Sequence, residues 1–337
     1  MMSNEYCGFL FIGDPHIASR PPGFRRDDFP RTVLGKLRAC LDYARDNCLV
    51  PVVLGDLFHW PRDSANWLLV ELMELFAERN VVAIAGNHDM QNDAPAPDDS
   101  LSVLVAARVV RLLSPTQPLA YPLKGGDGNQ FVRLLGSSWG TAPPKDFTRP
   151  DSTAFVCWIT HHDYAFGGDE AQTGGKRNLR LRELPGIDLV VNGHLHRPRE
   201  PISIGMTTWV NPGNITRLTR SAGSKAHRPA ALELLLWFAD HRVHHCMKPV
   251  PVPHAAFEEV FAEGEFENES AENVGSQAPL FQSSFVTDLL AITRVRTSDG
   301  TAARSVLTQH LEQLRVSDPA VAADIQQLIN EVLPHGS

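Results

Sequence analysis

The chain has 337 residues, of which 43% are hydrophobic, so it is long enough and apolar enough to form one large domain with an appendage. Its formal net charge of −8 argues against binding nucleic acid through a wholly basic surface, although it leaves room for a local basic track. We predict a cytoplasmic protein without a membrane segment or signal peptide, because no apolar stretch reaches ~20 residues, the chain starts acidic rather than basic, and its cysteines form no CxxC pair.

Five short apolar runs are each followed at once by side chains that bind metal ions. The runs are rich in Val, Ile, Leu and Phe and usually close on Gly, so we predict buried β-strands. Functional groups of α/β sheets collect beyond the carboxyl ends of the strands, so we expect the five clusters to meet in one crevice. The runs and their clusters are 8–13 with Asp14-Pro15-His16, 49–55 with Asp56, 81–86 with Asn87-His88-Asp89, 154–160 with His161-His162, and 187–193 with His194-Leu195-His196.

Two helical patterns alternate with the first strands, which is typical of βαβ units. Apolar side chains recur at helical spacing over residues 32–47 and 64–79, and each segment follows one predicted strand and precedes another. Irregular stretches flank two of the clusters, and we predict loops that line the crevice. After His196 three strand patterns follow without long helices between them, and we predict a second sheet that returns over the first. These patterns cover 207–213, 231–238 and 242–250.

The globular pattern ends at a proline-rich stretch, residues 249–253. Residues 262–280 are rich in Glu, Asn, Ser and Gly and resemble a linker. Two segments near the end have the spacing of short amphipathic helices. We therefore predict a main domain over residues 1–250, a linker or reduced additional domain over 251–302, and a helical tail over 303–337.

The five clusters supply enough ligands for two metal ions. Asp14 and His16 stand two residues apart at a strand end, so their side chains face alike. A single cluster of this kind more often stabilises a turn or holds hydrogen-bonded polar side chains. Five in series, each directly after a strand, are hard to explain by such structural roles. Carboxylate, amide and imidazole ligands without Cys favour Mn²⁺ and also admit Mg²⁺, Fe²⁺ or Zn²⁺. The pattern predicts a metal-dependent phosphoesterase.

The order of the clusters (DxH, GD, GNHD, HH, GHxH) resembles the calcineurin-like metallophosphoesterase superfamily from residue 7 to about residue 240. The second cluster, Gly55-Asp56-Leu57-Phe58-His59, more narrowly resembles the GDLFH or GDLFD signature of the Mre11/SbcD DNA-repair nucleases, and residues 26–29 also resemble that branch. The resemblance implies an α/β fold, a four-layer α/β/β/α metallophosphoesterase sandwich, here with a small helical C-terminal appendage.

The resemblance also implies which side chains hold two divalent ions. Asp56 would bridge them, because a carboxylate offers two oxygens to ions only ~3.5–4 Å apart. Ligands of one ion would be Asp14, His16 and His196, and ligands of the other would be Asn87, His161 and His194. His161 is favoured over His162 because it follows a small residue at the strand end, but the sequence leaves the choice open.

Three more side chains are predicted to take part in catalysis. His88 is not needed as a ligand, so it would stabilise the charge that develops around phosphorus or protonate the leaving oxygen. Asp89 would orient the His88 imidazole. In the Mre11 branch the residue at His59 lies near the substrate strand, and a histidine that only lines the cleft wall is an equally good interpretation.

Basic residues cluster on three predicted loops, over 20–31, 176–182 and 217–228. Such clusters are usually solvated surface, but around a two-metal cleft they gain weight as contacts to a phosphate backbone. From them we predict four substrate-binding residues, which are Arg20, Arg26, Arg177 and Arg217.

We therefore predict a DNA exonuclease or endonuclease subunit of Mre11/SbcD type that acts with a Rad50/SbcC-like coiled-coil ATPase bound by the tail. Other surfaces for the tail would be the chain's own core or a second copy of the chain in a homodimer, and the short 251–302 segment leaves little room for the DNA-binding cap of such nucleases. One alternative is a phosphodiesterase or phosphatase that acts on small nucleotides and needs neither basic track nor partner helices. Another is a non-catalytic scaffold of the same fold, which requires missing ligands, whereas here none is missing.

Overall fold

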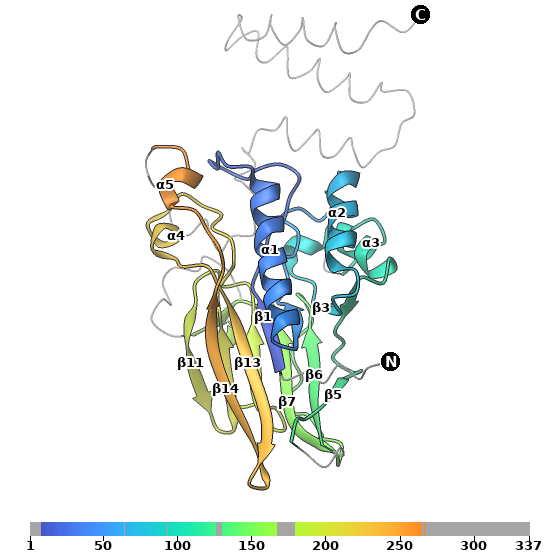
Figure 1. The fold of residues 1–337 in the computed structure, drawn as a ribbon. Coiled ribbons are helices and arrows are strands. Elements are labelled where there is room, and N and C mark those ends of the chain that lie inside the picture. The colour runs from blue at the N-terminus through green and yellow to red at the C-terminus, as the bar shows by residue number, and fades with distance from the viewer. Residues whose placement is uncertain are drawn as a thin grey trace, which may run out of the picture. The chain divides into compact units, whose positions relative to one another are not determined.

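Two β-sheets face each other at the centre of the main unit (residues 8–264), and helices cover the outer face of one of them (Figure 1). The structure is a computed structural model that describes residues 8–63, 65–92, 94–125, 130–166, 179–264 and 266. The predicted tail, most of the predicted linker and Arg177 lie outside these residues.

The first sheet has six strands in the order β14-β13-β1-β2-β3-β4. Strands β1 to β4 are parallel, whereas β13 pairs antiparallel with β1 and with β14. Helices α1, α2 and α3 make the parallel connections, as the predicted βαβ units require. The strands are β1 (Gly8–Ile12), β2 (Leu49–Val53), β3 (Val81–Ala83), β4 (Val110–Leu112), β13 (Ala230–Ala239) and β14 (Arg242–Pro251).

The second sheet also has six strands, in the order β11-β12-β10-β7-β6-β5. Its central strands β12, β10, β7 and β6 are parallel, and β11 and β5 are antiparallel edges. A separate pair, β8 and β9, lies beside it. The strands are β5 (Leu119–Pro122), β6 (Phe131–Ser137), β7 (Thr153–Thr160), β8 (Tyr164–Ala165), β9 (Leu179–Arg180), β10 (Leu189–Asn192), β11 (Arg199–Ile204) and β12 (Thr207–Asn211).

The strands after His196 do not all join the second sheet, which corrects the sequence prediction. Only β12 and the neighbouring β11 do so, whereas β13 and β14 extend the first sheet from the edge of β1. β13 pairs with β1 from Gly8↔Leu235 to Phe11↔Leu232, and Ala231 on one of its faces and Leu234 and Leu236 on the other are buried in the two cores that flank the first sheet. Strand pattern alone does not say which edge a strand will join.

The long helices lie close to where the sequence predicts them. α1 begins at Phe29, before the predicted start at residue 32, because the Asp28 side chain accepts a hydrogen bond from the backbone N–H of Arg31 and a proline occupies the first turn. α2 is shorter than the predicted 64–79. The helices are α1 (Phe29–Asp46), α2 (Asn66–Phe76), α3 (Ser100–Ala106), α4 (Ala222–Ala226) and α5 (Phe257–Val260), with a 3₁₀ turn η1 (Asn87–Asp89).

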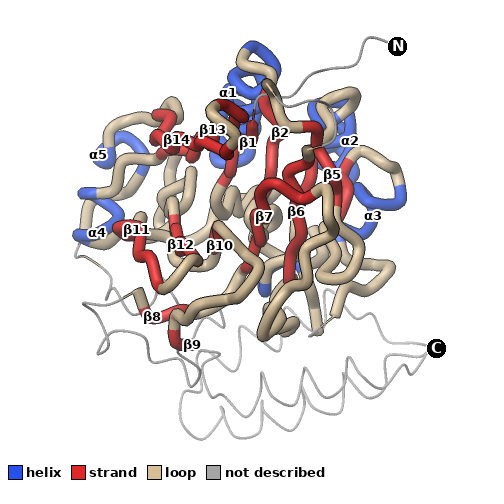
Figure 2. Tube along the Cα trace, turned by 90° about the horizontal axis from the view of Figure 1, so that it is seen from below, coloured by secondary structure: helices blue, strands red, loops and turns tan. Residues whose placement is uncertain are grey.

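Three apolar layers hold these elements together. Along β1, Phe9 and Phe11 face the second sheet, whereas Leu10 and Ile12 face the helices, as the alternation of a strand requires. Figure 2 shows α1, α2 and α3 on one side of the first sheet and the second sheet on the other. The α/β sandwich prediction is confirmed. In the described part of the chain, loops and the β8–β9 pair, rather than long helices, cover the outer face of the second sheet around Trp158.

The described structure continues beyond the predicted domain boundary at residue 250. A backbone bridge joins Phe261 to Arg25, and the backbone N–H of Arg26 donates to the Val260 carbonyl. Residues 254–264 with α5 therefore pack on the main unit. Among the helices of the described ranges, none is both long and apolar enough to span a bilayer.

Candidate metal centre

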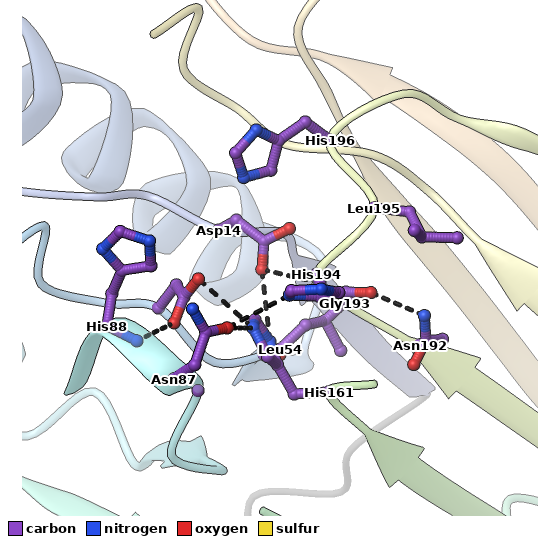
Figure 3. A network of polar contacts seen from close by, with 12 residues as sticks. Asp14, Leu54, Asn87, His88, His161, Asn192, Gly193, His194, Leu195 and His196 are labelled. Atoms are coloured by element: carbon purple, nitrogen blue, oxygen red, sulfur yellow. Dashed lines mark hydrogen bonds and ion pairs between the residues drawn. The ribbon is translucent and has the colours of Figure 1, made fainter. Parts of the chain in front are cut away.

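The five predicted clusters meet at one edge of the sandwich. β1, β2 and β3 of the first sheet bring three of them, and β7 and β10 of the second sheet bring the other two. Within each sheet these strands run parallel to one another, so their carboxyl ends face the same way. Figure 3 shows Asp14, Asn87, His161 and His194 pointing toward one another, with His88 and His196 at the border of the network.

The backbone at this edge adopts a conformation that ordinary residues avoid. Asp14, His16, Asp56 and His194 have positive φ angles of 35°, 50°, 45° and 70°. A non-glycine residue held there costs roughly 1–3 kcal/mol, and such residues gather at functional sites. The turns after β1, β2 and β10 are therefore built to direct these four side chains at a cost in stability.

One group of ligand atoms centres on His161. Its Nε2 lies 3.2 Å from Asp56 Oδ2 and 3.2 Å from Asn87 Oδ1, and His194 Nδ1 lies 3.1 Å from the same amide oxygen. The Nδ1 of His161 lies 2.8 Å from the Leu54 carbonyl, which can only accept a hydrogen bond. Nδ1 therefore carries a proton, and Nε2 is the ring nitrogen that faces the other ligand atoms, which is the arrangement of a metal-binding histidine.

A second group centres on His16. Its Nε2 lies 3.1 Å from His196 Nε2 and 3.6 Å from Asp56 Oδ2, so the Asp56 carboxylate reaches both groups. The rings of His59 and His88 lie 5.4 Å and 4.8 Å from the His16 ring, so three imidazoles meet here. Asp14 lies beside the first group, with Oδ1 3.5 Å from His161 Nδ1 and accepting from the backbone N–H of His194.

Burial keeps most of these imidazoles neutral. It lowers the pKa of His196 to about 3 and brings the pKa values of His16 and His194 well below their usual range. A neutral imidazole has a free lone pair, which a metal ion needs.

The buried carboxylates, in contrast, require a cation. Among the described residues, the ion-pair partners of Asp14 and Asp56 are histidines only. Burial alone would lower the pKa of His161, but the Asp56 and Asp14 carboxylates and the Leu54 carbonyl together outweigh it and raise that pKa to about 9. Burial also raises the pKa of Asp14 to about 7, and its Oδ2 has no hydrogen-bond partner in the described ranges. Divalent cations would supply the missing charge, so the residues present fit a metal site.

Close packing at two glycines joins neighbouring turns of the site. A Cβ atom added at Gly86 would lie 2.1 Å from Asp56 Oδ1, and one added at Gly193 would lie 2.8 Å from His161 Nδ1. Two of the predicted motifs, GNHD and GHxH, therefore need their glycine because a side chain of the preceding motif occupies that space.

His88 is oriented by a backbone group. Its Nδ1 lies 2.8 Å from the His59 carbonyl oxygen, so Nδ1 carries the proton and Nε2 is left for chemistry. Its own backbone N–H donates to Asp56 Oδ1 at 2.8 Å. Both contacts fix the imidazole relative to the Asp56 carboxylate.

Asp89 does not take the predicted part, and that prediction needs correction. Its carboxylate accepts hydrogen bonds from the backbone N–H groups of Leu57, Phe58 and Gly86 at 3.3, 2.9 and 2.9 Å. Asp89 therefore ties the turn after β2 to the turn after β3. It positions the loops that carry Asp56 and His88 instead of orienting an imidazole.

The structure brings His161 into the centre and leaves His162 outside it. The His162 ring is buried and stacked on Trp139, with centroids 6.0 Å apart, and neither of its nitrogens has a hydrogen-bond partner among the described residues. Trp139 also lies 4.9 Å from the His194 ring and so forms a wall on this side of the site. The sequence gives no signal for this contact, nor for the Leu54 carbonyl that orients His161.

The predicted substrate-binding arginines differ in their surroundings. Arg20 is exposed, and its guanidinium lies 4.7 Å above the Trp60 ring. Arg26 is also exposed and donates to the carbonyls of residues 258 and 259. Arg217 is buried and donates to the His227 and Ala255 carbonyls, so its guanidinium is engaged in holding backbone. Their binding of substrate stays a prediction, and Arg177 lies outside the described residues.

Residues 8–198 match the family of calcineurin-like phosphoesterases, which is more than half of the chain. No curated protein gives a significant match. Three solved structures are similar over most of their length. They are vacuolar protein sorting 29 from Cryptosporidium parvum (15% identity, 72% of this chain and 97% of that chain, TM-score 0.29), a predicted phosphoesterase from Streptococcus pneumoniae (11%, 71% and 97%, 0.29) and a double mutant of vacuolar protein sorting 29 from Entamoeba histolytica (16%, 72% and 99%, 0.28). At such TM-scores we draw no functional conclusion from them.

Proposed function

Because this chain belongs to the calcineurin-like phosphoesterase family, whose members use divalent metal ions, we propose that it is a two-metal phosphodiesterase that cleaves DNA. We place it in the Mre11/SbcD branch, as an exonuclease or endonuclease subunit. Its partner would be a Rad50/SbcC-like coiled-coil ATPase bound by residues 303–337. Mn²⁺ is the metal that the oxygen and nitrogen ligands favour.

The observation that most supports a nuclease is the position of His59 in GDLFH. Its ring is stacked on His88 with centroids 5.4 Å apart, and it lies equally far from the ring of the predicted ligand His16. His59 and His88 lie outside the predicted ligand set, and their rings lie next to each other beside the His16 ring. His88 is available to protonate the leaving oxygen, and His59 is available to contact a phosphate oxygen of the DNA strand beyond the cleaved bond.

Each residue of the site would have a defined task. Asp14, His16 and His196 would hold one ion, Asn87, His161 and His194 the other, and Asp56 both. The ions would supply Lewis-acid stabilisation of the phosphate oxygens. His88, whose Nδ1–H is held by the His59 carbonyl, would act with both ring nitrogens protonated, give the Nε2 proton to the leaving oxygen and become neutral. Asp89 would keep the two loops in register.

One observation favours the alternative, a phosphodiesterase or phosphatase for small nucleotides. Several guanidinium groups of the expected basic track are engaged with the chain itself. Arg25 pairs with Asp27 at 2.6 Å, Arg217 holds two backbone segments, and Arg220 donates to the Ala262 carbonyl. A shorter basic surface suits a small nucleotide better than a long DNA strand.

A side-by-side assay separates the two functions. End-labelled single- and double-stranded DNA, a nucleoside monophosphate and bis-p-nitrophenyl phosphate would each be incubated with the full chain and Mn²⁺, with Asp56→Asn as the inactive control. We expect metal-dependent DNA cleavage that the control lacks. Hydrolysis of the small substrates without DNA cleavage would favour the alternative, and no hydrolysis of any of these substrates would contradict both.

A further inference from the structure

A cavity of about 300 Å³ opens next to the metal centre, lined by Ser19, Arg20, Trp60, Arg62, Asp63 and Ala65. This volume is at the lower end of the ~300–1,000 Å³ range of small-molecule sites. The Trp60 ring lies 4.7 Å from the ring of His59, edge to face. His59 in turn contacts His16 and His88. The cavity is therefore one side chain away from the imidazoles of the candidate centre.

The cavity is fixed relative to that centre by its backbone. The chain after His16 and the chain after Asp56 run together, with the N–H of Ile17 donating to the Leu57 carbonyl at 2.8 Å and the N–H of His59 donating to the Ile17 carbonyl at 2.9 Å. Further along, the buried Asp63 carboxylate accepts from the N–H of Ser19 at 2.6 Å. The two loops that carry Arg20 and Trp60 therefore keep one spacing from the metal ligands.

The chemistry of the cavity is that of a flat aromatic wall beside cations. The half-buried Trp60 ring offers a face, over which the exposed Arg20 guanidinium lies at 4.7 Å. Arg62 also reaches the cavity, although it pairs with Asp98 at 2.8 Å. The Asp63 carboxylate accepts hydrogen bonds from the backbone N–H groups of Ser19 and Ala65. These bonds reduce its repulsion of a phosphate in the cavity.

From these contacts we infer that the cavity is a nucleobase subsite, in which Trp60 stacks on the base of the nucleotide next to the scissile phosphate and Arg20 contacts that nucleotide's phosphate. The inference rests on the proposed action on nucleotides at the adjacent centre. In the structure Arg20 covers the Trp60 ring, and a base would displace or sandwich it. Stacking of a base on an aromatic side chain strengthens binding by roughly 5- to 150-fold, whereas an exposed cation–π contact strengthens it only roughly 2- to 5-fold. A base would therefore replace Arg20 on the face of the Trp60 ring.

The base and the phosphate can be tested apart, by titrating the Mn²⁺-loaded full chain with dAMP and with 2-deoxyribose 5-phosphate in a calorimeter. We expect dAMP to bind 5- to 150-fold more tightly, Trp60→Ala to reduce that ratio to near one, and Trp60→Phe to retain most of it. Any damage that Trp60→Ala does to the metal centre affects both ligands and cancels in the ratio. Trp237→Ala, which removes an exposed tryptophan of β13 outside the cavity, should keep the ratio.

Equal binding of the two ligands by the unchanged chain would overturn the subsite, and so would a ratio that survives in Trp60→Ala or falls equally in Trp237→Ala. DNA cleavage measured in parallel tests the proposed function separately. A ratio that depends on Trp60 without DNA cleavage would keep the subsite and assign it to small nucleotides. DNA cleavage with a ratio of one would keep the nuclease and reject the subsite.

Discussion

A single methyl group at Gly86 tests whether the turn after β3 and the carboxylate of Asp56 form one unit. Gly86 has φ −89° and ψ −179°, which any residue adopts, so Gly86→Ala introduces no backbone strain. The added Cβ would lie 2.1 Å from Asp56 Oδ1 and 2.4 Å from the Asp56 backbone nitrogen. Relief of this overlap requires the carboxylate or its backbone to move by more than an ångström.

A displacement of that size is large compared with a coordination bond of roughly 2.0–2.2 Å. Changes that only disturb the support of a ligand already weaken metal binding by about 10–100-fold. Because Gly86→Ala moves the proposed bridging ligand itself, we expect Mn²⁺ affinity to fall at least 100-fold and diester hydrolysis to be lost with it.

Calorimetric titration with Mn²⁺, hydrolysis of bis-p-nitrophenyl phosphate and thermal unfolding would be measured on the unchanged chain, Gly86→Ala and the matched control Gly35→Ala. A Cβ at Gly35 in α1 meets nothing within 4 Å, so the control should bind metal normally and gain about 0.5–1 kcal/mol of stability. Normal Mn²⁺ binding and hydrolysis by folded Gly86→Ala would refute the close packing of the two turns.

Four further changes have defined outcomes. Asp56→Asn should abolish activity and loosen both ions, and two tightly bound metals in this variant, by elemental analysis, would remove the bridging role. His88→Asn should keep both ions and lower kcat by ~10²–10⁴; metal content that falls in step with the rate would make His88 a ligand. Burial lowers the pKa of Lys36 from 10.5 to about 7, so its charge destabilises the fold below pH 7 and less as the pH rises toward 10. Lys36→Met should therefore gain about 2 kcal/mol at pH 6 after loss of the hydrogen bond to the Ile215 carbonyl, and an equal or larger gain at pH 9.5 in urea unfolding would contradict this. Deletion of 277–337 should leave diester hydrolysis intact and remove co-purification with a Rad50/SbcC-like ATPase; an unfolded core, seen by circular dichroism, would make the tail structural.

The sequence predicted well those features that local pattern determines. The apolar runs before Asp14, Asp56 and His194 became buried strands, because a run buried on both faces has little alternative in a layered sheet. The convergence of their ends followed from parallel pairing. The choice of His161 over His162 also agreed with the geometry, since only His161 reaches Asn87 and Asp56.

Contacts between distant segments were not predictable in the same way. The sheet that receives β13 is decided by its pairing with β1, and the burial of Arg217 depends on the return of the chain at Ala255. The role of Asp89 was predicted from its position next to His88, whereas two of the three backbone N–H groups that its carboxylate binds lie 31 and 32 residues earlier. Clusters of charged and polar residues in the sequence indicate a candidate binding or catalytic site. They do not show which of these side chains will form hydrogen bonds with distant backbone groups instead.

The central claim is that the strand ends of both sheets form one centre for two divalent ions shared by Asp56. Anomalous diffraction from crystals of the Mn²⁺-loaded protein tests it most directly. We predict two peaks roughly 3.5–4 Å apart, with the Asp56 carboxylate between them. A single peak, or a peak held by His16, His59 and His88 without Asp56, would contradict the account.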